Sequence, residues 1–178
     1  HSLSINSSTI SVGLVANPVS ARDIRRVIAN ATSLQVSDRA NIVMCVLAAV
    51  RACGVKRVLM MPENGGIRSL LKRGLQREQK LGDNRFPELE MTDTQISGTV
   101  DDTFAATQAM VNSGVKAIVV LGGDGTHRAV AKVCGQVPIA GISTGTNNAF
   151  PEHREPTITG LAVGLAATGR IPERVAFT

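Results

Sequence analysis

Residues 115–126 of this 178-residue chain read VKAIVVLGGDGT, and this stretch decides the fold. The almost continuous apolar run at residues 115–121 is typical of a central parallel strand that is covered on both faces. The glycines that follow predict a tight turn, and the pattern after them predicts a helix over residues 126–134. A strand, a glycine turn and a helix in this order indicate one unit of an α/β fold.

The same alternation of strand and helix extends to both sides of this unit. Apolar runs predict further strands at residues 12–16, 56–61, 88–92 and 137–142. Helices are expected between them, at residues 21–29, 37–53, 67–80, 99–113 and 157–167. Right-handed crossovers between successive strands then give a doubly wound, mostly parallel sheet with helices on both faces.

Particular residues predict where the helices begin and end. Ser37 and Thr157 are expected as N-caps, and Thr99 with Asp102 resembles a capping box. Gly54 is expected to end the helix that begins at Ser37.

Composition excludes several classes of protein. With 43% apolar and 19% charged residues the chain is not disordered, and no apolar run is long enough for a membrane span. There is no Trp or Tyr and only four Phe, so a surface that stacks bases is excluded and no nucleic-acid partner is expected. No signal-peptide pattern is present, and three cysteines (Cys45, Cys53 and Cys134) at spacings without a metal or redox motif predict reduced thiols in a cytoplasmic protein.

The net charge of +5 is concentrated on the helix expected after Gly66, where Arg and Lys alternate with leucines at helical spacing. This pattern indicates a solvated helix face, or a surface that attracts phosphate-bearing ligands. For domain organisation, we expect an N-terminal extension or cloning scar at residues 1–9 and an α/β nucleotide-binding domain at residues 10–170. Residues 171–178 are expected to begin a second domain or to form a tail.

Ligands of open α/β sheets bind at the carboxyl ends of the strands, near the point where the strand order reverses. There Gly122, Gly123 and Gly125 would let backbone N–H groups approach an anion, at the N-terminus of the next helix. Asp124 among them indicates a bound cation or a proton acceptor for a hydroxyl. The alternative is an ordinary turn in which Asp124 caps the helix.

Other polar loops follow neighbouring strands. Residues 143–150 (STGTNNAF) offer hydroxyls and carboxamides suited to a base edge, a ribose or a phosphate, or to turn formation alone. Asn17 and Ser20 follow the first strand, and the loop at residues 63–66 follows the second. His127 is either a general base or an ordinary helix-surface residue.

These motifs carry a family resemblance. GGDGT after an apolar strand resembles the hallmark of the superfamily of NAD kinases, diacylglycerol kinases and sphingosine kinases, and more distantly of phosphofructokinases. NPVS at residues 17–20 is similar to the NPxSG turn of the lipid-kinase branch, and STGTNNAF to its GTxND segment. Together with MMPENGG at residues 60–66 and EMTDTQISGTVDDT at residues 90–103, they most resemble AcoX-type proteins, which are encoded in acetoin-catabolism operons.

The resemblance implies an ATP-dependent phosphotransferase that uses Mg²⁺ and acts on a small molecule bearing a hydroxyl group. It implies Asp124 as the catalytic residue and metal ligand, and nucleotide contacts from Gly122, Gly123, Gly125, Thr126, Asn17, Thr146 and Asn147. NAD or polyphosphate in place of ATP, and a homo-oligomer, are left open.

Two departures from the family pattern favour an alternative, a nucleotide-binding or regulatory module without catalysis. Family members continue into a β-rich second domain, so the chain is expected to be an N-terminal fragment, and Asn148 stands where lipid kinases often have Asp.

Overall fold

The computed structural model describes residues 9–17, 29–82, 85–143 and 154–169. Strands and helices alternate strictly along these residues. They are β1 (Ser11–Ala16), α1 (Ala29–Ala52), β2 (Arg57–Met60), α2 (Ile67–Lys80), β3 (Glu88–Met91), α3 (Val100–Asn112), β4 (Ile118–Gly122), α4 (Asp124–Val133), β5 (Ile139–Ser143) and α5 (Arg154–Ala167).

The five strands form one sheet in the order β3-β2-β1-β4-β5, and every pair is parallel. The expected α/β fold is therefore confirmed. Strands are added outward from β1 to β3, after which the chain returns to the other side of β1 to form β4. The strand order thus reverses between β1 and β4.

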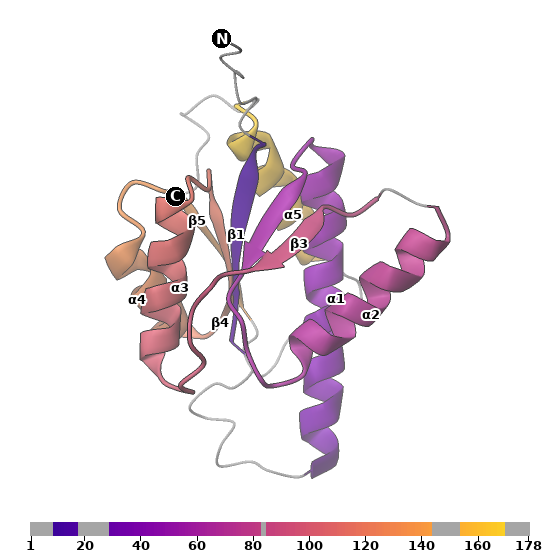
Figure 1. Ribbon diagram of the computed structural model, residues 1–178, viewed down its shortest axis with the longest axis horizontal. Coiled ribbons are helices and arrows are strands. Elements are labelled where there is room, and N and C mark those ends of the chain that lie inside the picture. The colour runs from indigo at the N-terminus through magenta and orange to yellow at the C-terminus, as the bar shows by residue number, and fades with distance from the viewer. Residues whose placement is uncertain (1–8, 18–28, 83–84, 144–153, 170–178) are drawn as a thin grey trace.

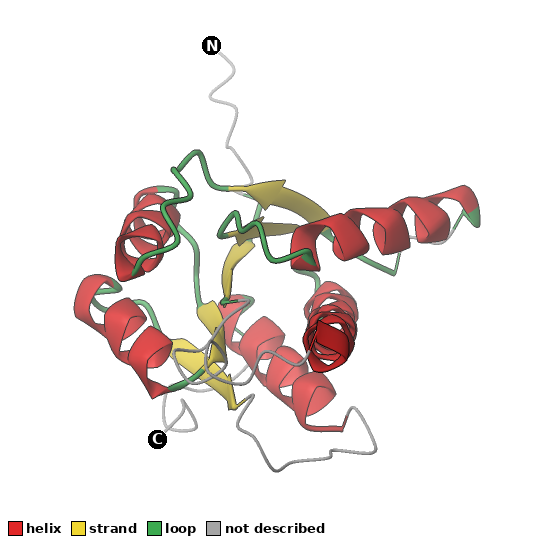
Figure 2. Ribbon diagram, turned by 90° about the horizontal axis from the view of Figure 1, so that it is seen from below, coloured by secondary structure: helices red, strands yellow, loops and turns green. Residues whose placement is uncertain are grey.

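Two hydrophobic layers cover the sheet, one on each face. On one face α1, α2 and α5 pack against side chains such as Leu14, Met60 and Val119. On the other, α3 and α4 pack against the alternate residues, among them Val15 and Val120. This alternation along β1 and β4 is the period of a strand that is buried on both faces. Figure 2, viewed from below Figure 1, separates the two groups of helices on either side of the strands.

Helix α1 is much longer than the strands beside it. Its 24 residues correspond to about 36 Å at the usual rise per residue, whereas a six-residue strand spans about 20 Å. Figure 1 shows the N-terminal half of α1 continuing past the lower ends of the strands, which are their carboxyl ends. One long helix therefore stands beside the edge where ligands of such sheets bind.

Two of the expected N-caps are wrong. Ser37 is an exposed residue inside α1, which already includes Ala29. The helix extends upstream because Val36 packs against the core and water can satisfy an exposed hydroxyl within a helix. Thr157 lies within α5, where its side chain is hydrogen-bonded to the Cys45 thiol of α1.

The start of α3 is as expected, but its capping box is rearranged. Thr99 is the N-cap, and its hydroxyl accepts from the N–H of Asp101 at 3.3 Å. The carboxylate of Asp102 accepts from the N–H groups of Ser97 and Gly98, which lie two residues and one residue upstream of the cap, instead of from the cap itself.

Other expectations are confirmed within the described residues. Gly54 ends α1 with a φ of 99°, and all three cysteines are free thiols. None of the described helices is both long and apolar enough to cross a membrane. The helix expected at residues 21–29 falls almost wholly outside the described residues, as does the segment at residues 171–178.

Candidate functional site

The candidate site lies where the strand order reverses, between the carboxyl ends of β1 and β4. The last residue pair of these strands is Ala16 with Leu121. Beyond it, the N–H of Asn17 still donates to the carbonyl of Leu121 at 3.1 Å. The two chains then separate, and the sequence GGDGT leaves the sheet at this point.

The last three residues of GGDGT form the first turn of α4, so this helix begins two residues earlier than predicted. Gly123 is the N-cap in an extended conformation (φ −85°, ψ −178°). Because glycine has no side chain, the helix start receives no hydrogen bond from a cap side chain. Asp124 is the first helical residue and not the cap, because the Gly123 carbonyl already accepts the first bond, from His127. The N–H groups of residues 124–126 lie in the first turn, where an α-helix offers them no carbonyl partner of its own. We call this opening, residues 122–126, the α4 cradle.

The glycines of the α4 cradle differ in what the fold requires of them. A Cβ on Gly122 would lie 3.2 Å from Thr126, so Gly122 makes room for that side chain. A Cβ on Gly123 or Gly125 would meet no atom of the described residues within 4 Å, and neither residue has a positive φ. Glycine is common at an N-cap such as Gly123, whereas within a helix it costs up to about 1 kcal/mol relative to alanine. Packing, backbone conformation and capping therefore explain Gly122 and Gly123 but not Gly125.

Asn17 and Thr126 meet across the point of reversal. The Asn17 Nδ2 donates to Thr126 Oγ1 at 3.1 Å, which joins the end of β1 to the first turn of α4. The carbonyl of Asn17 in turn accepts from Nη1 of Arg39, on α1, at 2.6 Å. Arg39 is only 6% exposed.

Arg39 was not among the residues that the sequence singled out. A signal for it exists, because Arg39 is four residues before Val43 and falls in the buried stripe of α1 with Val43, Val46 and Val50. An arginine on an otherwise apolar stripe indicates a buried polar partner, but the partner belongs to a strand 22 residues away.

Asp124 is exposed at the mouth of the α4 cradle. Within the described ranges no three His, Cys, Asp or Glu side chains gather as a metal cage. A single carboxylate beside open amides nevertheless fits Mg²⁺, which usually binds one or two carboxylates together with substrate phosphates and water. Asp124 would be the protein ligand of that ion.

His127 and Glu63, in the loop after β2, make contacts with residues outside the α4 cradle. The His127 ring lies over β5, where a Cβ on Gly141 would be 2.9 Å from its Nδ1. Glu63 is buried, and its carboxylate accepts from the N–H groups of Gly65 and Arg68 at 2.5 and 2.6 Å, so it stabilises the start of α2. Thr146 and Asn147 lie outside the described residues.

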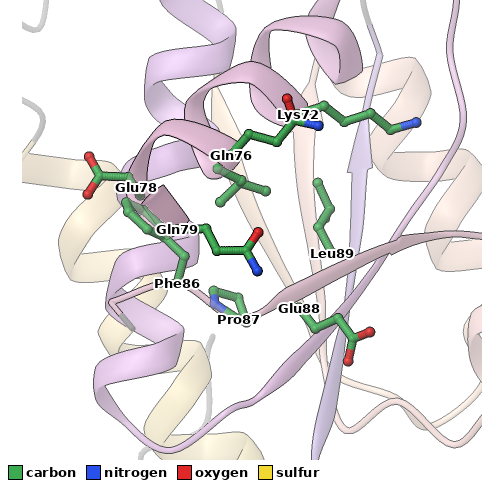
Figure 3. Close-up of a pocket in the computed structure, with 9 residues that line it drawn as sticks. Lys72, Gln76, Glu78, Gln79, Phe86, Pro87, Glu88 and Leu89 are labelled. Carbon is green, nitrogen blue, oxygen red and sulfur yellow. The ribbon is translucent and has the colours of Figure 1, made fainter. Parts of the chain in front are cut away.

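A separate hollow of about 440 Å³ lies between α2 and β3. Figure 3 shows Lys72, Gln76 and Gln79 from α2 around it, facing the segment that carries Phe86 and Leu89. Strand β3 is an edge strand and is separated from β4 by β2 and β1. This hollow is therefore not part of the site at the point of reversal.

Comparison with known proteins agrees with this fold. The family of ATP-NAD kinase N-terminal domains matches residues 12–171. The chain belongs to this family. Its fold is thus that of a NAD-kinase-type domain.

Among curated proteins, this NAD-kinase-type chain is similar to the acetoin catabolism protein X of Cupriavidus necator, with 62% identity over 161 residues. The match covers 90% of this chain and 45% of that relative, so the chain spans less than half the length of the relative. No solved structure matches this chain.

Proposed function

We propose that this chain is the nucleotide-binding part of an ATP-dependent phosphotransferase that acts on a hydroxyl group. Membership of the NAD-kinase family supports a nucleotide ligand. Within the chain, the proposal places the phosphates of ATP at the α4 cradle, in contact with Asn17 and Thr126 and, from the loop after β5, Thr146 and Asn147.

The observation that carries this proposal is Gly125, a glycine in the first turn of α4 that no contact with the described residues requires, next to the N-cap glycine Gly123. In the part of the chain that the structure describes, no atom lies within 4 Å of a Cβ added at Gly123 or Gly125. Beside them the first-turn N–H groups and the positive end of the α4 dipole favour an anion. A phosphate chain lying against the backbone would account for the absence of a Cβ at both positions.

Asp124 is the acidic group of this site. When bound, Mg²⁺ would neutralise charge on the phosphates, and Asp124 would hold it at the mouth of the α4 cradle. The overall reaction breaks the bond between the γ-phosphorus and the β,γ-bridging oxygen, forms a bond from that phosphorus to the acceptor oxygen, and releases ADP and the hydroxyl proton. Positioning and charge neutralisation are the main requirements of such a transfer.

The relative's name supports a role in acetoin catabolism. We propose that the acceptor is a small hydroxyl-bearing molecule and that residues beyond this chain complete its site, because the relative is more than twice as long as the matched region. A cytoplasmic location remains a proposal that rests on the free cysteines.

The test is ATP binding and turnover by the full-length protein with Mg²⁺. Replacement of Asp124 by Asn should lower turnover on the order of 100-fold, as removal of one electrostatic group at a transition state does. Asp101→Asn is the matched control, because Asp101 is also an exposed acid in the first turn of a helix. Equal turnover in both variants would refute the role of Asp124. Binding of ATP without turnover would instead identify a regulatory module.

A further inference from the structure

Arg39 is a buried cation close to the candidate site. Its side chain is almost fully shielded, with 6% of the residue exposed, and arginine is rarely buried to this degree without partners. The guanidinium remains charged in proteins, so its burial requires acceptors for its N–H groups. One acceptor is the carbonyl of Asn17, at 2.6 Å from Nη1, which is a short distance typical of a charge-assisted hydrogen bond.

Asn17 is held from three directions. Its N–H donates to Leu121 on β4 at 3.1 Å. Its carbonyl accepts from Arg39 on α1, and its side chain donates to Thr126 on α4. The paired register of β1 and β4 ends one residue earlier, at Ala16. Contacts from the flanking helices therefore fix Asn17 beyond the end of the β1–β4 ladder.

These contacts connect the two faces of the sheet. Helix α1 belongs to the layer with α2 and α5, and α4 belongs to the layer with α3. The two hydrogen bonds from Arg39 to Asn17 and from Asn17 to Thr126 link one layer to the other where the strand order reverses. Thr126 is the third residue of α4, so it ends within the α4 cradle.

We propose that Arg39 is a positioning residue of the phosphate site. Arg39 holds the backbone carbonyl of Asn17 and so keeps the side-chain amide of Asn17 in position to donate to Thr126. This Asn17–Thr126 bond sets the direction in which the Thr126 hydroxyl faces a ligand. The identity of the ligand rests on the proposed function, whereas the geometry assigned to Arg39 does not.

The first experiment needs no ligand. The side-chain amide resonance of Asn17 is followed by ¹⁵N NMR in the full-length protein and assigned by its loss in Asn17→Ala. Arg39→Met, which keeps the apolar stem, should shift this resonance and speed its exchange with water. Arg51→Met is the matched control, because Arg51 lies in the last turn of the same helix. An unchanged Asn17 resonance in Arg39→Met would overturn the proposal.

The second experiment is a double-mutant cycle on ATP affinity, with Arg39→Met and Thr126→Val. If Arg39 acts through the Asn17–Thr126 bond, Arg39→Met should weaken binding about tenfold alone but less than about twofold in the Thr126→Val background. Additive losses would show that Arg39 acts by another route and would refute the proposal.

A third variant covers a folding failure. If Arg39→Met does not fold, Arg39→Lys keeps the buried charge but not the planar fork; it should still shift the Asn17 resonance relative to the wild type, and an unchanged resonance would overturn the proposal. If the wild-type protein does not bind ATP, the proposed function fails while the NMR experiment still decides the role of Arg39.

Discussion

Nδ2 of Asn17 donates to Oγ1 of Thr126 at 3.1 Å, although the two residues are 109 positions apart. The bond exists because the sheet places the end of β1 beside the end of β4. Gly122 makes room for it, since a Cβ there would lie 3.2 Å from the Thr126 side chain, a tight contact. A strand end, a glycine and a helix start thus form one junction at the mouth of the site.

Thr126→Val should destabilise the protein by about 1 kcal/mol, because it leaves the partly buried Asn17 amide without this acceptor. The measurement is the free energy of unfolding in urea. Thr126→Ser, which keeps the hydroxyl, is the control and should lose much less. A valine variant as stable as the wild type would show that the Asn17–Thr126 bond contributes nothing to stability.

Gly125→Ala should separate stability from ligand binding. The added methyl group meets no atom within 4 Å among residues 9–17, 29–82, 85–143 and 154–169, and alanine is the better helix former, so stability should rise by up to about 1 kcal/mol. ATP affinity should nevertheless fall, since the methyl group would project toward the bound phosphates. Calorimetric titration and thermal unfolding of the same sample test both effects. Undiminished affinity would argue against phosphates at the α4 cradle.

Gly160→Ala is the opposite case, also at a helical glycine. Its added methyl carbon would lie 2.7 Å from the Cβ of Ala49 and 3.0 Å from the carbonyl oxygen of Val46, where α5 packs closely on α1. Forcing a methyl group into this contact should cost about 1–3 kcal/mol. A urea titration of this variant beside Gly125→Ala tests the contrast, and a similar stability for the two would mean that α1 and α5 can separate without penalty.

Acid should weaken the start of α3. Desolvation raises the pKa of Asp102, but hydrogen bonds from Ser97 and Gly98 outweigh it, so the pKa of this carboxyl lies below its ordinary value. A depressed folded-state pKa stabilises the fold above the unfolded value, about 3.9, and this stabilisation is lost as pH falls through the folded pKa.

Asp102→Asn should therefore reduce the loss of stability between neutral pH and about pH 3. The free energy of unfolding at both pH values is the measurement, with the adjacent exposed Asp101→Asn as control. An acid loss identical to that of the wild type would contradict a stabilising role for the ionised Asp102.

Local patterns were sufficient to predict the α/β alternation and the position of the α4 cradle. Residues 118–122 form the expected strand, and the helix expected after the glycine turn is present, although it begins at Asp124 instead of Thr126. Helix starts were less predictable. Ser37 and Thr157 have the chemistry of N-caps, yet contacts from Val36 to the core and from Thr157 to Cys45 place both inside longer helices.

The sequence by itself determined that strands and helices alternate, that the sheet is buried on both faces, and where a glycine-rich turn follows a strand, because each of these depends on residues a few positions apart. Only the tertiary structure decided that Arg39, Asn17 and Thr126 form one continuous set of contacts. The physical reason is that this set depends on which strands become neighbours and how two helix layers close over them, and long-range pairing of this kind leaves no local pattern in the chain.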